Sequence, residues 1–105
     1  MTIKANLEAM LAAGQDSAML RYTLGNAYLK DGDLAAALAH LHAAVELDPG
    51  YSAAWKSYAK ALTESGAVAS AIHAYETGIE VAESKGDMQA AKEMRVFLKR
   101  LKKAF

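Results

Sequence analysis

Apolar residues recur along this chain at helical spacing, and short polar turns separate the periodic segments. An α-helix returns to the same face every three to four residues, so the pattern predicts helices and not strands. Glycines and the polar residues beside them mark where each helix stops and the next begins. These signals predict helices over about 4–13, 17–30, 34–47, 52–64, 67–84 and 88–103.

The turn residues supply specific start and stop chemistry. Gly32 is free to adopt a positive φ that ends one helix, and Asp33 is placed to cap the next. The stretch 85–87, Lys-Gly-Asp, repeats this arrangement. Pro49 is the one proline and marks a break, since proline lacks the N–H that a helix interior needs. Alanine, the best helix former, is abundant, whereas β-branched residues are scarce.

An internal repeat determines the expected fold. A shift of 34 residues superposes identical landmarks in the two halves of the chain. The matching pairs are Ala27 with Ala61, Gly32 with Gly66, Ala35 with Ala69, Ala37 with Ala71 and Glu46 with Glu80. One period holds one helix–turn–helix unit, which cannot bury its apolar face alone, so the units are expected to stack.

The stretch LGNAYLKDGDLAAALAHLHAAVELDPG resembles the tetratricopeptide repeat (TPR) family. The family's landmark residues stand at Leu24, Gly25, Tyr28, Ala37, Leu41, Ala44 and Pro49, and in the second unit at Trp55, Tyr58, Ala59, Leu62, Ala71 and Tyr75. The second unit departs from the pattern where Gly78 replaces an alanine and Glu83 replaces the proline. Without that proline, we expect the fifth helix to continue towards Ser84.

The resemblance implies an all-α, right-handed solenoid of helical hairpins forming one domain over residues 1–105. We divide it into an N-terminal half-repeat helix (4–14), repeat 1 (18–51), repeat 2 (52–85) and a C-terminal capping helix (88–103). The last helix carries an apolar stripe and a basic face, as a terminal cap requires.

The resemblance also implies a concave surface, lined by the first helix of each unit, that binds extended peptides. The inward positions carried onto this chain are Tyr22, Asn26 and Leu29, then Lys56, Lys60 and Thr63. Each set has the spacing i, i+4, i+7 and therefore forms one stripe on a helix. The lysines favour an acidic peptide. A full carboxylate clamp is not expected, because Tyr22 and Ser57 stand where the clamp has lysine and asparagine.

Composition limits the other function classes. The chain has no cysteine, and twelve basic side chains balance twelve acidic ones. We expect no cofactor and no metal site, the three histidines being ordinary surface residues. The sequence shows no convergent set of acid, base and nucleophile, so we do not expect an enzyme. No run approaches the roughly 18 apolar residues that a membrane span needs. The start, MTIKANLEAM, lacks the layout of a secretory signal, which favours the cytoplasm.

These observations predict a protein-binding module that takes a peptide or partner segment, with a preference for acidic partners. Two alternatives stay open. One is a self-associating scaffold, and the other is electrostatic contact of the basic last helix with nucleic acid. Nucleic acid is not the expected partner, since aromatic residues for base stacking on that helix are few. The expected state is a monomer or a weak homodimer.

Overall fold

The computed structural model describes residues 2–104, so the domain ends Met1 and Phe105 lie outside the described residues. The described chain is entirely helical apart from its turns. The helices are α1 (Ile3–Ala12), α2 (Ala18–Lys30), α3 (Leu34–Leu47), α4 (Ser52–Glu64), α5 (Val68–Ser84) and α6 (Met88–Ala104). Each predicted helix is present, with ends that lie within a residue or two of those expected.

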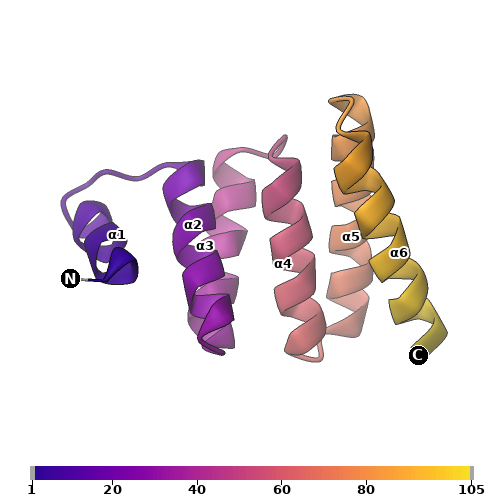
Figure 1. Cartoon of the computed structure of the whole chain (residues 1–105), viewed down its shortest axis with the longest axis horizontal. Helices are drawn as coiled ribbons and strands as arrows, with labels where there is room; N and C mark the ends of the chain where they lie inside the picture. The colour runs from indigo at the N-terminus through magenta and orange to yellow at the C-terminus, as the bar shows by residue number, and fades with distance from the viewer. Residues whose placement is uncertain (1, 105) are drawn as a thin grey trace.

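Successive helices pack as antiparallel hairpins that line up along a 41 Å long axis (Figure 1). The helices α2, α4 and α6 lie on the near side in Figure 1, with α3 and α5 behind them. We call the near side, where α2 packs on α4 and α4 on α6, the groove face. The far side, formed by α3 and α5, is the outer face. The prediction of an all-α helical-repeat solenoid is confirmed.

Small residues let the helices approach closely. Ala37, Ala59 and Ala71 are fully buried in the core between the stacked units. At Gly25, a Cβ atom would lie 2.6 Å from Cγ of Leu41, so only glycine fits without movement. The repeat landmarks seen in the sequence therefore mark helix crossings.

The turn chemistry acts as predicted. Gly32 has a φ of +81°, in the left-handed region that favours glycine. One Asp33 carboxylate oxygen accepts a hydrogen bond from the backbone N–H of Ala36 at 3.2 Å, which caps α3. Asp87 caps α6 in the same way through the N–H of Ala90, also at 3.2 Å.

The long fifth helix changes the repeat register. The helix α5 continues to Ser84, as expected from the missing proline, and spans 17 residues against 14 in α3. As a result, α6 starts 36 residues after α4, whereas α4 starts 34 residues after α2. The fully buried Met94 of α6 then packs against Gly78, where a Cβ would lie 2.7 Å from its sulfur. The glycine that departs from the family pattern accommodates this side chain.

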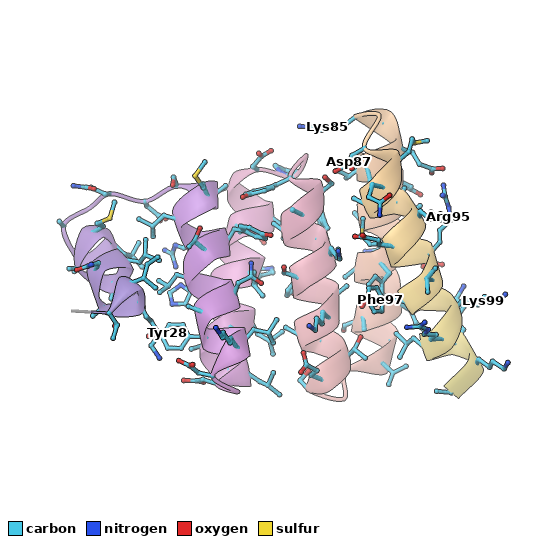
Figure 2. All side chains as sticks on the ribbon, in the orientation of Figure 1. Tyr28, Lys85, Asp87, Arg95, Phe97 and Lys99 are labelled. Carbon is cyan, nitrogen blue, oxygen red and sulfur yellow. The ribbon has the colours of Figure 1, made fainter. Side chains whose placement is uncertain are left out.

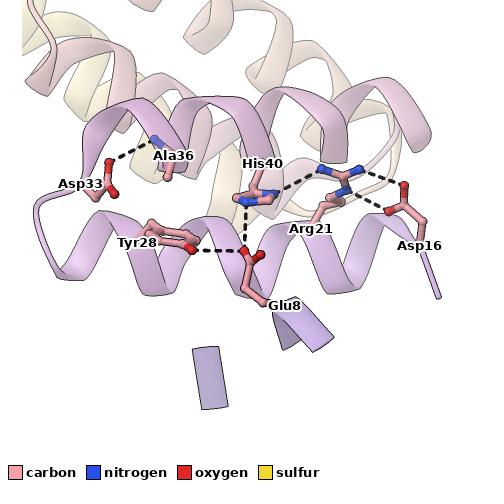
Figure 3. A network of polar contacts seen from close by, with 7 residues as sticks. All are labelled: Glu8, Asp16, Arg21, Tyr28, Asp33, Ala36 and His40. Carbon is pink, nitrogen blue, oxygen red and sulfur yellow. Dashed lines mark hydrogen bonds and ion pairs between the residues drawn. The ribbon is translucent and has the colours of Figure 1, made fainter. Parts of the chain in front are cut away.

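A polar network fastens α1 to the first repeat (Figure 3). Glu8 of α1 accepts a hydrogen bond from the Tyr28 hydroxyl at 3.1 Å and lies 3.4 Å from Nε2 of His40. Arg21 donates to Nδ1 of His40 at 3.2 Å and pairs with both carboxylate oxygens of Asp16, at 2.8 and 3.0 Å. The expectation that His40 is an ordinary surface residue is wrong, because Tyr28 and Arg21 of α2 and Glu8 of α1 lie against it and its side chain is 14% exposed.

Candidate functional site

The first predicted stripe lies on α2 and serves partly as core. Tyr22 is half-buried, with its ring centroid 4.9 Å from that of Tyr51. Leu29 packs against the buried cluster that includes Leu41 and Ala61. Asn26 is half-exposed, and its side chain forms no hydrogen bond with the residues that the structure describes. Of this stripe, Asn26 is therefore the residue with polar atoms available to a partner.

The second stripe lies on α4, and its two lysines differ. The ammonium of Lys56 donates to the carboxylate of Glu93 on α6, which also accepts from the Gln89 side chain at 2.9 Å. The hydrogen bond from Lys56 is the main reason that the pKa of Glu93 lies below its usual value, and the bond from Gln89 adds to it. Lys56 is thus neutralised within the chain, and the sequence contains no local signal for this pairing.

Lys60 and Thr63 complete the α4 stripe. Lys60 is exposed and forms no ion pair with any of residues 2–104. The Thr63 hydroxyl donates to the carbonyl of Ala59 at 2.8 Å, so its proton is used within the helix. Lys60 is therefore the available cation of the predicted set.

The helix α6 adds a third stripe that sequence reasoning missed. Glu93, Phe97 and Arg100 have the same i, i+4, i+7 spacing as the two predicted stripes. Phe97 lies on the α4 side of α6, whereas Arg95 and Lys99 point away from α4 (Figure 2). This spacing could have revealed the third stripe in the sequence. However, the apolar stripe and basic face of the helix favoured its interpretation as a cap. In addition, the shifted register of α6 hides the match to α4.

A small apolar hollow connects the second and third stripes. It has a volume of about 250 Å³ and is lined by Thr63, Tyr75, Phe97, Arg100, Leu101 and Ala104. The rings of Tyr75 and Phe97 stack with centroids 6.2 Å apart, and the Arg100 guanidinium lies 6.0 Å from the Phe97 centroid. Arg100, like Lys60, forms no ion pair with the described residues. This hollow suits one apolar side chain with an anionic group beside it.

The residues 2–104 contain no cluster of three or more His, Cys, Asp or Glu side chains arranged to hold a metal ion. None of the described helices is long and apolar enough to cross a membrane. The candidate site is therefore a binding surface made of side chains from α2, α4 and α6.

Comparison with known proteins places this architecture in a family. A family model described as "Tetratricopeptide repeat" matches residues 28–94. A TPR repeat-containing protein of Pseudomonas aeruginosa is 50% identical over 98 residues, which cover 93% of each chain.

Solved structures give the same result. The solution structure of a Bordetella parapertussis protein has a TM-score of 0.86 and 47% identity, covering 99% of this chain and 90% of that one. The crystal structure of a tetratricopeptide repeat domain protein from Salinibacter ruber has a TM-score of 0.78 and 28% identity, covering 83% of this chain and 97% of that one. The repeat spacing, the helical stacking and these relatives together show that the chain belongs to the tetratricopeptide repeat family.

Proposed function

We propose that this protein is a non-catalytic binding module that takes an acidic peptide or partner segment on the groove face. Proteins of the TPR family generally mediate protein–protein interaction, and the proposal specifies the surface and the chemistry. The proposed site keeps the six predicted residues Tyr22, Asn26, Leu29, Lys56, Lys60 and Thr63 and adds Phe97 and Arg100. The whole chain would act as a single domain in the cytoplasm, and it would need no cofactor.

The proposal rests on an apolar hollow lined by the available cation Arg100, with a second available cation, Lys60, about one helical turn from the lining residue Thr63. Lys60 and Arg100 have no carboxylate partner among the described residues, and Thr63 and Phe97 line the hollow beside Arg100. A peptide with one bulky apolar residue and neighbouring carboxylates would gain apolar burial and charge attraction together. Asn26 supplies further polar contacts along the same face. Lys56 contributes little, since Glu93 already neutralises it.

The test begins with a random peptide library displayed on phage and selected on the wild-type protein. Selected peptides should carry Asp or Glu close to an apolar residue. Their affinity, measured by fluorescence anisotropy, should fall by about tenfold or more in the variant Lys60→Glu/Arg100→Glu, because attraction becomes repulsion. Thermal melting should stay close to that of the wild type, as for typical exposed substitutions.

The matched control is Lys99→Glu/Lys103→Glu, which reverses two charges on α6, with Lys99 on the side away from α4 (Figure 2). It should bind the selected peptides within about twofold of the wild type. If the control loses binding and the groove variant keeps it, the site lies on the far side of α6. Failure to select any acidic peptide would also contradict the proposal.

A further inference from the structure

The outer face carries a second and larger hollow, on the opposite side of the molecule from the groove face. The backbones of α3 and α5 do not approach each other closely, and α4 forms the floor between them. The hollow has a volume of about 680 Å³. Its apolar lining comes from Val45 on α3, from Trp55, Tyr58 and Leu62 on α4, and from Ala74 on α5. We call this hollow the outer groove.

Aromatic rings form much of the floor of the outer groove. The centroids of Trp55 and Tyr58 lie 6.2 Å apart, and the His42 ring lies 5.7 Å from that of Tyr58. The Trp55 indole N–H donates to the carbonyl of Pro49 at 2.8 Å, so its polar group is satisfied within the chain. What remains is apolar surface and ring faces, which attract both bulky apolar side chains and cations.

The helices that flank the outer groove carry negative charge. The helices α3 and α5 contain no Lys or Arg and carry four glutamates, Glu46, Glu76, Glu80 and Glu83. Glu83 pairs with Arg95, and Glu76 lies 3.6 Å from Lys102. Glu80 forms no ion pair with the described residues, and Glu46 contacts only Nε2 of His42, at 3.0 Å.

Glu46 and Glu80, neither of which pairs with a Lys or Arg among residues 2–104, lie in or next to the outer groove. Glu46 lines the outer groove itself. Glu80 lines an adjoining hollow, which shares His73 with the outer groove and includes Glu76, Thr77 and Ile79. Along α5, the apolar lining residue Ala74 and the carboxylate of Glu80 therefore lie about one to two helical turns apart.

We propose that the outer groove binds a basic amphipathic helix of another protein. One bulky apolar side chain of the partner helix, or two at positions i and i+4, enters the groove over Trp55, Tyr58 and Leu62. Lys or Arg side chains one to two turns further along meet Glu46 and Glu80. The mode is that of a helix in an apolar groove, with charge complementarity setting its direction. The groove face prefers the opposite charge, so the two faces select different partners.

A second copy of this chain is a poorer occupant. Its one basic helix, α6, already buries its apolar stripe, Ala91, Met94 and Leu101, within its own fold. The basic face of a docked α6 would bring charge to the outer groove but few apolar side chains to fill it.

The probe for the test is a synthetic, fluorescein-labelled helical peptide of about 14 residues, long enough to form a helix on binding. It has Leu or Phe at i, i+4 and i+7 and Lys at the adjoining positions. There are two control peptides. One carries the same residues in scrambled order, and the other has Glu in place of each Lys. The wild-type protein should bind the basic amphipathic peptide about tenfold more tightly than either control.

The blocking variant is Ala69→Arg, at an exposed position that lines the outer groove. Its matched control is Ala35→Arg, the exposed α3 residue one repeat earlier, which does not line the groove. Ala69→Arg should weaken the peptide by about tenfold or more, whereas Ala35→Arg should leave it within about twofold. The double variant Glu46→Gln/Glu80→Gln should weaken binding of the peptide and make its affinity less dependent on salt. Glu64→Gln, at the end of α4, is the control and should have neither effect.

Several outcomes would overturn the proposal. One is failure of the wild type to prefer the basic amphipathic peptide over its controls. Another is an equal loss of binding in Ala69→Arg and Ala35→Arg. A third is a concentration-dependent dimer, detected by sedimentation, that Ala69→Arg abolishes, since the occupant would then be a second copy. Tighter binding of the basic peptide in Lys60→Glu/Arg100→Glu, with no loss in Ala69→Arg, would assign it to the groove face.

Discussion

Lys56 and Lys60 lie one turn apart on α4, yet their neighbours give them different capacities to bind a partner. Lys56 forms an ion pair with Glu93, whereas Lys60 forms no ion pair with the described residues. An anion approaching Lys56 must displace a carboxylate that is already in place, and this competition reduces the net attraction. Residue identity alone does not determine which lysine is available.

Removing that competing carboxylate should strengthen binding at the groove face. In Glu93→Gln, Lys56 loses its ionic partner and becomes available to an acidic peptide. We expect the affinity for peptides selected on the wild type to rise about two- to tenfold at low salt. Stability should change by less than about 1 kcal/mol, as for exposed ion pairs. An unchanged or weaker affinity in fluorescence anisotropy would show that the peptide does not approach Lys56.

Gly25 provides a residue-scale test of the packing. In Gly25→Ala, the new Cβ would lie 2.6 Å from Cγ and 2.8 Å from Cδ2 of Leu41. Overpacking of this kind costs about 1–3 kcal/mol, while the gain in helix propensity is about 0.5–1 kcal/mol. The net effect should be a lower free energy of unfolding in urea titration. A more stable variant would mean that α2 and α3 cross elsewhere.

The contacts of His40 predict that the stability of the fold depends on pH. Since Arg21 donates to Nδ1, the proton of the neutral imidazole lies on Nε2, facing Glu8. Burial chiefly, together with the charge of Arg21, holds the pKa of His40 below its ordinary value of 6.5, although Glu8 and Asp16 act in the opposite direction. A second proton would have to enter at Nδ1, against the Arg21 guanidinium.

A lowered histidine pKa means that the unfolded chain takes up the proton first as the pH falls. The stability that neutral His40 provides is therefore present above about pH 6.5 and is lost as the pH drops through the folded pKa. We expect the melting temperature to fall between about pH 7.5 and about pH 5.5. His40→Gln, which keeps a donor and an acceptor, should show a smaller fall. Equal falls in both proteins would contradict this role for His40.

At the scale of the elements, the helix starts differ although the repeat is regular. Asp33 caps α3 through the N–H of Ala36, whereas the equivalent residue one repeat later, Ala67, has no capping side chain at the start of α5. The two residues have similar backbone angles, φ −86° and ψ 83° for Asp33 against φ −83° and ψ 70° for Ala67. The second site therefore has the geometry of a cap without its oxygen.

Exchanging the two cap residues tests this comparison in both directions. Asp33→Ala should lower the free energy of unfolding by about 0.5–2 kcal/mol, because the Ala36 N–H loses its acceptor. Ala67→Asp should raise it by up to about 1 kcal/mol by supplying the missing acceptor at α5. Both changes are measured by chemical denaturation. If Asp33→Ala has no effect, α3 is held at its start by packing alone.

The sequence predicted the elements well because their determinants are local. Glycine, proline and capping residues act within a few positions, so the helix ends followed from the chain itself, including the extension of α5 to Ser84. The place of α6 in the groove was harder to predict. Its role depends on the shift to 36 residues, which arises from the length of α5 and the packing of Met94 on Gly78.

At the scale of the whole molecule, the unpredicted features depend on contacts between distant helices. Three such features are the pairing of Lys56 with Glu93, the contact of His40 with Glu8 of α1 and the gap between α3 and α5. Each involves residues far apart in the sequence. The repeat period indicates which helices stack, but it does not give the rotation that brings particular side chains together. Of the six predicted groove residues, Tyr22 and Leu29 also contribute to packing. Their apolar character in the sequence was compatible with packing and with partner binding alike.

The two proposals together give the molecule two faces with opposite charge preferences. The groove face offers Lys60 and Arg100, and the outer face offers Glu46 and Glu80. Partners of opposite charge would therefore be held on opposite sides of the solenoid, with α4 contributing to both sites. If both proposals hold, this arrangement would let one small chain connect two proteins without either partner blocking the other.

The most direct measurement is an amide chemical-shift titration of the isotope-labelled protein with an acidic peptide selected by phage display. If the peptide binds on the groove face, the largest shift changes should fall in α2, α4 and α6, concentrated around Asn26, Lys60, Thr63, Phe97 and Arg100. Changes in α3 and in the outer half of α5 should be small. Shift changes concentrated on α3 and α5, with the residues of the groove face unaffected, would contradict binding at the groove face.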